Sequence, residues 1–350
     1  MTPREGATPL LVLDEDQRML LDAARELLGV EAPLSRARAL RDAGQALDHS
    51  LWQHLTDQGW AGVAVPEAHG GLGLGMVEAA AFMEVVGAHL AATPMVSALM
   101  VGPLAPRLGT ADGRIVALAW QESARHPDPS RVASTWNGRT VTGEKVVVLD
   151  GAHADAFVVS ARDGSGHLVL LAVDAVDATV APLHRVDHRD AARVRFDSAP
   201  ARVLDAHLAD LEAAVDRGTV ALSAELLGLA STSLDLTLDY LRTREQFGRP
   251  LGAFQALQHR AVDAFIGVEL ARSAILAAAF EPSALHTSLA KAQASIAATK
   301  VAEEGIQMHG GIGMTDEHDI GLLFKRIFVA AASHGDAPWH RRRWATLRGY

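Results

Sequence analysis

The sequence predicts an α+β protein with an N-terminal helical domain (residues 1–113), a middle antiparallel β-barrel-like domain (114–205) and a C-terminal four-helix bundle (206–350). Two observations predict this fold class. Apolar residues recur at helical spacing in the first and last thirds of the chain, whereas the middle third consists of short Val/Thr-rich runs separated by turn dipeptides. The chain has 350 residues, of which 49% are hydrophobic, so it is long enough to bury a large core.

The first domain is predicted from two groups of apolar residues that follow the helical period. A break comes after the second group, where Val65-Pro66-Glu67 and the glycine-rich residues 70–75 disfavour a continued helix. We therefore expect a loop at this point. The periodic apolar residues are Met19, Leu20, Ala23 and Leu27, followed by Leu51, Leu55 and Trp60.

The middle domain is predicted from β-branched runs that end at turn signals. The dipeptides Asn137-Gly138 and Asp163-Gly164 are typical of tight turns between antiparallel strands. We therefore expect a small antiparallel sheet. The predicted strands span residues 116–120, 131–136, 140–149, 157–160 and 167–173.

The helical period returns from about residue 205 in long segments. Gly310-Gly311 is a suitable C-cap, because glycine adopts the left-handed backbone that often ends a helix. Long helices joined by short connections pack as an antiparallel bundle. The four predicted helices span residues 208–244, 254–279, 283–309 and 320–333.

The charge balance and the cysteine count exclude several classes of function. Asp and Glu number 42 against 32 for Lys and Arg, and the net charge of −10 argues against a nucleic-acid binder held by counterion release. The absence of cysteine excludes disulfides, iron–sulfur clusters, zinc–thiolate sites and a Cys nucleophile. No metal site is predicted, and any chemistry must come from His, carboxylates, hydroxyls or a bound cofactor.

Neither a secretory leader nor a membrane span is predicted. The apolar residues 10–13 are followed at once by Asp14-Glu15-Asp16, so they are too short for the core of a signal peptide. The longest apolar stretch, around residues 95–104, falls short of the roughly 20 residues that cross a bilayer. We therefore expect a cytoplasmic protein.

Three motifs, in the same order as in the family, resemble the acyl-CoA dehydrogenases. They are YLRTREQFGRPLGAFQ at residues 240–255, IQMHGGIGM at 306–314, and the segment at 55–75 that contains GWAGVAVPE and the glycine loop. The resemblance covers nearly the whole chain. It implies an FAD-dependent α,β-dehydrogenation of an acyl-CoA thioester, with electron-transfer flavoprotein as the electron acceptor.

The resemblance also implies that six residues of this chain contact the ADP half of an FAD seated on the neighbouring subunit. The chemistry of the residues is consistent with this, because the Arg244 guanidinium is a planar, permanently charged fork suited to a pyrophosphate. Glycine permits close backbone approach. The implied cofactor-binding residues are Arg244, Gln246, Phe247, Gln307, Gly310 and Gly311.

The sequence departs from the family where the flavin ring would be held within one subunit. Family members resemble Thr-Glu-Pro-x-x-Gly-Ser-Asp at the first element, but residues 120–129 lack the glycine and the Ser-Asp pair. After the retained Gly143-Glu144-Lys145, the positions of a Trp and a Ser or Thr hold Val147 and Leu149. These side chains cannot hydrogen-bond to a flavin.

The usual catalytic base is also missing. Most members carry a Glu in a Glu-Gly-Thr step, and the matching step here is His334-Gly335-Asp336. Other members place a Glu early in the first bundle helix, close to Gly218 of this chain. His334 and Asp336 remain as substitute candidates for the base, because removing a proton next to a thioester needs a positioned basic group.

Three hypotheses follow from the resemblance and its departures. The leading one is a subunit of a heteromeric, α2β2 acyl-CoA dehydrogenase of the kind found in steroid catabolism, which contributes FAD contacts to the active site of a second acyl-CoA dehydrogenase-like subunit. The second is a self-sufficient homo-oligomeric dehydrogenase of lipid catabolism with Asp336 or His334 as base. The third is a non-catalytic scaffold on the same fold, since a fold does not fix a function.

Overall fold

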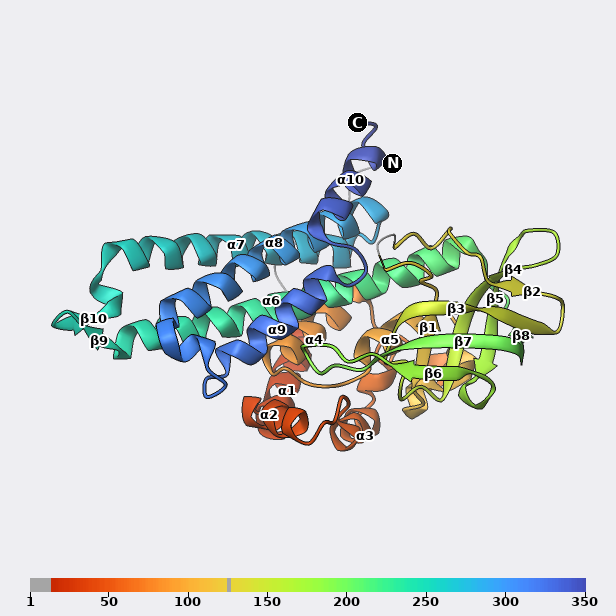
Figure 1. Cartoon of the computed structure of the whole chain (residues 1–350), viewed down its shortest axis with the longest axis horizontal. Coiled ribbons are helices and arrows are strands. Elements are labelled where there is room, and N and C mark those ends of the chain that lie inside the picture. The colour runs from red at the N-terminus through yellow and green to blue at the C-terminus, as the bar shows by residue number, and fades with distance from the viewer. Residues whose placement is uncertain (1–13, 125–126) are drawn as a thin grey trace. The chain divides into compact units, whose positions relative to one another are not determined.

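The computed structural model describes residues 14–124 and 127–350 (Figure 1). Residues 1–13 of the predicted N-terminal domain, and Arg125 and His126 within the stretch 120–129, lie outside the described residues. The chain forms two compact units that alternate along the sequence. The first unit comprises the described residues up to Leu34, Met76–Ala91 and Leu222–Tyr350, and the second comprises Ser35–Gly75 and Ala92–Ala221.

Helices precede and follow a single large sheet, which confirms the predicted fold class. The predicted boundaries after residues 113 and 205 stay a prediction. The helices are α1 (Glu15–Glu31), α2 (Leu34–Asp42), α3 (His49–Asp57), α4 (Met76–Ala88), α5 (Met95–Val101), α6 (Leu208–Thr243), α7 (Gln255–Phe280), α8 (Ala284–His309), α9 (Ile320–Ala332) and α10 (Ala337–Leu347). The strands are β1 (Val116–Ala119), β2 (Thr135–Trp136), β3 (Thr140–Leu149), β4 (Ala156–Arg162), β5 (Leu168–Asp174), β6 (Thr179–Pro182), β7 (Ala191–Pro200), β8 (Arg202–Val203), β9 (Glu245–Gln246) and β10 (Arg249–Pro250).

The large sheet has eight strands and is mixed rather than purely antiparallel. The strand order is β6-β7-β3-β2-β4-β5-β8, and β1 pairs with β4 in parallel, with Val116 opposite Ala156. The parallel pairing is possible because β2 and β3 lie between β1 and β4 in the sequence, and a parallel neighbour needs such a crossover. The rings of Phe157 and Phe196 meet edge to face at 5.9 Å within the sheet's buried core.

The predicted strand at residues 131–136 is mostly wrong, because only Thr135 and Trp136 pair as β2. The backbone N–H groups of Ala133 and Ser134 donate to the Glu122 carboxylate, at 2.6 and 3.0 Å. These N–H groups therefore donate to a side chain and do not pair with a neighbouring strand. The predicted loop at residues 65–75 is confirmed, since it contains only a short 3₁₀ turn at Glu67–His69.

The long helices of the predicted bundle begin and end within one residue of the predicted positions. Gly310 is the C-cap of α8, as predicted, although its φ of 64° and ψ of −137° lie outside the left-handed helical region, in a conformation that favours glycine. Helix α1 buries a different face from the one that the sequence predicts. Ala24 and Leu28 are fully buried, whereas Met19 is 66% exposed, because the apolar residues of α1 cover more than one side of the helix.

Helix α4 approaches α6 so closely that only glycine fits at two positions of the contact. A Cβ on Gly87 would lie 2.1 Å from the Glu225 carbonyl oxygen, and a Cβ on Gly228 would lie 1.9 Å from the Glu84 carbonyl oxygen. The two glutamates at these points also pair with arginines through their side chains. Glu225 binds Arg326 of α9 at 2.6 and 2.8 Å, and Glu84 binds Arg272 of α7 at 2.6 Å.

We expect Gly228→Ala to lower the free energy of unfolding by about 1–3 kcal/mol, because its Cβ must push α4 away from α6. The matched control is Gly267→Ala on α7, whose Cβ would meet the Ala297 Cβ at an ordinary 3.7 Å. This control should raise the free energy of unfolding by about 0.5–1 kcal/mol, because alanine favours the helix. Urea denaturation measures both, and two stabilising substitutions would contradict the close approach.

Candidate functional site

Three of the predicted cofactor-binding residues lie at the hairpin that follows α6. Arg244 precedes β9, Gln246 is in β9, and Phe247 forms the turn to β10 with Gly248. Phe247 and Gly248 have φ of 55° and 78°, as a two-residue type I′ turn requires. A left-handed backbone costs a residue with a Cβ about 1–2 kcal/mol, yet Phe247 is 89% exposed. Within the described residues, its only ring contact is the edge-to-face contact with Phe254.

The Arg244 guanidinium is available to an external anion. The Arg244 backbone is fixed, because its N–H donates to the Tyr240 carbonyl and its C=O accepts from the Leu251 N–H, both at 2.8 Å. In the described part of the chain its exposed side chain has neither an ion-pair nor a hydrogen-bond partner. The neighbouring arginines differ, since Arg242 pairs with Asp239 at 2.7 Å and Arg249 lies over a phenyl ring.

The remaining predicted cofactor-binding residues lie where α8 ends. Gln307 is exposed on the last turn of α8, and Gly310 and Gly311 open the 3₁₀ turn Gly310–Met314. A Cβ at either glycine would meet nothing within 4 Å, so the backbone faces open space. The Tyr240 ring stacks on His309 at 4.5 Å, which brings the ends of α6 and α8 together. The two motifs therefore share one end of the bundle.

The two candidate bases lie in the turn between α9 and α10. His334 is buried with φ of 55°, and burial, together with the Lys291 ammonium, lowers its pKa to about 3. Asp336 is exposed and caps α10, because its carboxylate accepts from the Trp339 N–H at 2.8 Å. His334 is therefore a weak proton acceptor at neutral pH, and Asp336 already has a structural role.

A buried lysine, Lys291, lies beneath this turn and was not predicted from the sequence. The Lys291 ammonium of α8 donates to the carbonyl oxygens of Ala331 and Gly335, at 2.7 and 3.1 Å, and to the Ser295 hydroxyl at 3.2 Å. Burial lowers the pKa of Lys291 to about 7. A lysine among alanines and serines in the middle of a helix was the signal available for this anchor.

The resemblance places several side chains of this chain's own sheet and of the loop before it next to a flavin ring. These side chains are either apolar or already hydrogen-bonded within the protein. Val147 and Leu149 of β3 offer no donor or acceptor. Burial favours a raised pKa for Glu122, but the Lys145 ammonium at 2.7 Å and the Ser134 hydrogen bonds outweigh it and lower the pKa. Burial lowers the pKa of Lys145 itself to about 8. Glu122 and Lys145 thus fasten the loop to the sheet.

Comparisons with known proteins identify the family of this chain. The model of the acyl-CoA dehydrogenase N-terminal domain matches residues 14–114, and the model of the C-terminal domain matches residues 209–346. The chain belongs to the acyl-CoA dehydrogenase family, whose members are FAD-dependent oxidoreductases acting on CH–CH groups. Both resemblance and predicted cofactor are thereby confirmed.

Individual relatives cover almost the whole chain. The acyl-CoA dehydrogenase IpdE2 of Mycolicibacterium smegmatis is 32% identical over 95% of this chain and 98% of its own length. The structure of the ChsE4–ChsE5 complex from Mycobacterium tuberculosis superposes with a TM-score of 0.88 at 27% identity, covering 97% of this chain and 98% of that one. The Tcur3481–Tcur3483 steroid acyl-CoA dehydrogenase variant gives a TM-score of 0.84 at 30% identity, covering 96% and 98%.

Residues 14–124 and 127–350 contain neither a membrane-spanning helix nor a cluster of metal ligands. No helix there combines the length and apolar character needed to cross a membrane. No group of three or more His, Asp or Glu side chains in the same residues is arranged to hold a metal ion.

We expect acid to destabilise the fold through the buried histidines. Burial, then Lys291, lowers the pKa of His340 to about 2. Between that value and about pH 6.5 the unfolded chain binds a proton that the folded chain does not, so stability falls as pH drops, by up to about 1.4 kcal/mol per pH unit. His340→Gln, which keeps a donor toward the His334 carbonyl, should reduce this slope in urea unfolding between pH 7 and 5.

The variant His334→Asn should reduce the same slope, because asparagine tolerates the left-handed backbone and removes a group whose pKa lies near 3. Slopes identical to that of the parent in both variants would contradict the assignment of neutral, buried imidazoles.

Proposed function

We propose that this chain is one subunit of a heteromeric, α2β2 acyl-CoA dehydrogenase that introduces an α,β double bond into a steroid-derived acyl-CoA. In this proposal it clamps the ADP half of an FAD whose flavin ring lies on the partner subunit. One observation carries the proposal. The Arg244 hairpin and the Gly310–Gly311 turn are open to a nucleotide, whereas Val147 and Leu149 offer the flavin ring no hydrogen bond.

Each clamping residue has a definite task in this proposal. The planar guanidinium of Arg244 pairs with the pyrophosphate oxygens, and the Gln246 and Gln307 amides bond to polar edges of the nucleotide. The exposed Phe247 ring packs against a flat part of it. When bound, FAD supplies the acceptor for the hydride removed from the β carbon.

The α proton must go to a base, and we propose that the partner provides it. His334 is buried and its pKa is lowered to about 3, so its imidazole is too weak a base to take up the proton at neutral pH. The Asp336 carboxylate accepts from the first turn of α10 and stabilises that helix. His334 therefore lacks both access and basicity, and Asp336 is engaged as the cap of α10. This supports a subunit that completes another chain's active site.

An exposed apolar stripe on α7 supports association with a second chain. Val262, Phe265, Ile266 and Leu270 recur at helical spacing and are 50–58% exposed. A contiguous apolar patch of this kind is uncommon on a monomer and marks interaction surfaces. We propose that the stripe packs against another acyl-CoA dehydrogenase-like subunit.

Two structural neighbours support the finer points of the proposal. One is a ChsE4–ChsE5 complex and the other a Tcur3481–Tcur3483 steroid acyl-CoA dehydrogenase variant, so each pairs two different proteins by name. By analogy, we assign this chain a steroid-derived acyl-CoA substrate and a second subunit. From membership of the family, we further propose electron-transfer flavoprotein as its electron acceptor and the cytoplasm as its location.

The first test is the flavin content of the purified chain. Produced alone, it is expected to contain little or no FAD and to show no dehydrogenase turnover. Co-produced with its partner, it is expected to give an assembly with one FAD for each pair of unlike subunits. Visible absorbance of the released flavin measures the ratio, and a stoichiometric yellow flavoprotein from this chain alone would overturn the proposal.

The second test addresses the clamp. In the assembly, Arg244→Gln should weaken FAD retention at least tenfold, because a charge-assisted hydrogen bond contributes about 1.5–3 kcal/mol. The matched control is Arg202→Gln on β8, another exposed arginine outside the motifs. Flavin retained after dialysis measures the effect, and equal retention in both variants would support a non-catalytic scaffold instead.

The third test distinguishes the self-sufficient enzyme. Asp336→Asn preserves the cap of α10, since asparagine caps helices as well as aspartate does. We expect the assembly carrying this variant to keep its turnover within about twofold. Loss of turnover with FAD retained, here or in His334→Ala, would assign the base to this chain and favour the homo-oligomeric alternative.

A further inference from the structure

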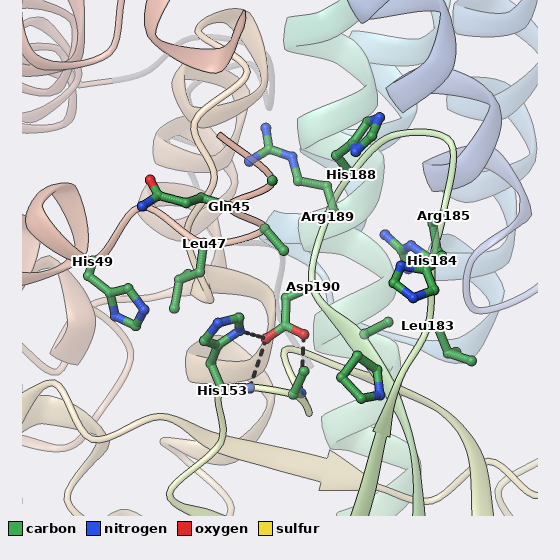
Figure 2. A pocket seen from close by; sticks show the side chains of 15 residues that line it. Gln45, Leu47, His49, His153, Leu183, His184, Arg185, His188, Arg189 and Asp190 are labelled. Carbon is green, nitrogen blue, oxygen red and sulfur yellow. Dashed lines mark hydrogen bonds and ion pairs between the residues drawn. The ribbon is translucent and has the colours of Figure 1, made fainter. Parts of the chain in front are cut away.

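The second unit contains a cavity of about 510 Å³ that none of the predicted site residues line. Three segments form its wall: the connection from α2 to α3 at residues 44–49, the turn after β3 at residues 152–153, and the loop from β6 to β7 at residues 182–191 (Figure 2). A volume of this size accommodates a small metabolite.

The polar side chains of the wall are mainly hydrogen-bond donors. Each imidazole carries at least one N–H in either charge state, and each guanidinium carries five. Figure 2 shows Gln45 and His49 on one side of the hollow and the loop that carries His184 and His188 on the other. The donor-bearing residues are His49, His153, His184, Arg185, His188 and Arg189.

The acidic groups at the cavity are occupied by the protein itself. The Asp190 carboxylate is 2% exposed and accepts from the Ala152 N–H, the His153 N–H and the His153 Nδ1, at 3.1, 3.1 and 2.9 Å. The fully buried Asp187 carboxylate pairs with the Arg185 guanidinium at 3.0 and 3.2 Å. Acceptor oxygens are therefore withdrawn from the hollow. The same pairs engage Nδ1 of His153 and two nitrogens of Arg185. The donors left at the hollow are therefore mainly those of His49, His184 and His188.

The loop is held in a strained shape that keeps its donors at the cavity. His188 has φ of 54°, a left-handed conformation that is uncommon for residues other than glycine. The His188 N–H closes the turn by donating to the Arg185 carbonyl at 3.1 Å. The Leu183 N–H closes the base of the loop by donating to the Ala191 carbonyl at 2.9 Å. Strain of this kind persists where the surroundings fix the backbone, and it is common at ligand sites.

We propose that this cavity is a binding site for a small phosphorylated anion of about the size of pyrophosphate or a nucleotide. Donors on three separate segments match an acceptor-rich group with several oxygens, and arginine is well suited to phosphate. A metal ion does not fit as the occupant, because the histidines of the described wall form no group able to ligate one.

The experiment is calorimetric titration of pyrophosphate into the full chain, in the assembly in which it purifies. All proteins carry Arg244→Gln, so that pyrophosphate bound at the proposed FAD clamp does not contribute. We expect saturable binding that weakens at least tenfold in His184→Gln/His188→Asn, where asparagine tolerates the left-handed backbone at residue 188. The control is His167→Gln in the β4–β5 turn, whose affinity should equal that of the parent.

Three outcomes would overturn the proposal: no binding of pyrophosphate to the parent, unchanged affinity in the double variant, or equal binding of citrate, which would indicate an unselective anion site. If the double variant fails to fold, as judged by its melting temperature, His49→Gln replaces it and the same tenfold loss is expected, because His49 lines the opposite wall. Failure of the FAD clamp does not affect this result, because Arg244 is absent throughout.

Discussion

The approach of α4 to α6 without an intervening side chain is the constraint on which the helical unit depends. Gly87 and Gly228 let each backbone meet a carbonyl of the other helix, that of Glu225 and that of Glu84. The same two glutamates then bind Arg326 on α9 and Arg272 on α7. The Glu225–Arg326 pair is buried, so removing either partner would leave an unpaired charge in the interior and destabilise the fold by about 3–5 kcal/mol. The distance between the helices must therefore allow these side chains to reach each other. Helix α7 follows the Arg244 hairpin, and α9 leads into the His334 turn. The contact between α4 and α6 therefore supports the helices next to both of these segments.

The turn after α9 illustrates how a segment can keep its shape without acting as a base. Lys291 holds it from below through two backbone carbonyls, and the three N–H bonds of its ammonium match its three oxygen acceptors. Burial opposes the charge on Lys291, while the oxygens stabilise it. The same burial keeps His334 and His340 neutral. Lys291 and the two histidines therefore contribute to the geometry of this turn, and the exposed Asp336 caps a helix.

The sequence was sufficient to predict the long helices, the glycine loop and the family, because their signals are local: a 3.6-residue period, glycines at turns and contiguous motifs. It was insufficient where distant residues decide the local structure. The strand expected at residues 131–136 is shortened by the Glu122 carboxylate, and the parallel pairing of β1 with β4 depends on a crossover. Strands β6 and β7 were not predicted, although Val194 and Phe196 alternate with exposed arginines along β7. Within the candidate site, the positions of Arg244 and Gly310 followed from the motifs, whereas the Lys291 anchor required the packing of α8 against α9 and α10.

The hairpin after α6 is costly to maintain within a single chain. Phe247 adopts a left-handed backbone and leaves most of its ring in water, and the Arg244 side chain finds no partner among residues 14–124 and 127–350. The edge contact with Phe254 recovers only part of this free energy, since an aromatic pair contributes about 0.5–1.5 kcal/mol. A chain that gained nothing further from the hairpin would be more stable with a glycine or asparagine at the turn. In the assembly that we propose, a dinucleotide bound by the neighbouring subunit would cover both the Phe247 ring and the Arg244 guanidinium, because it is flat in one part and anionic in another. This contact would offset the free energy that the hairpin costs the single chain.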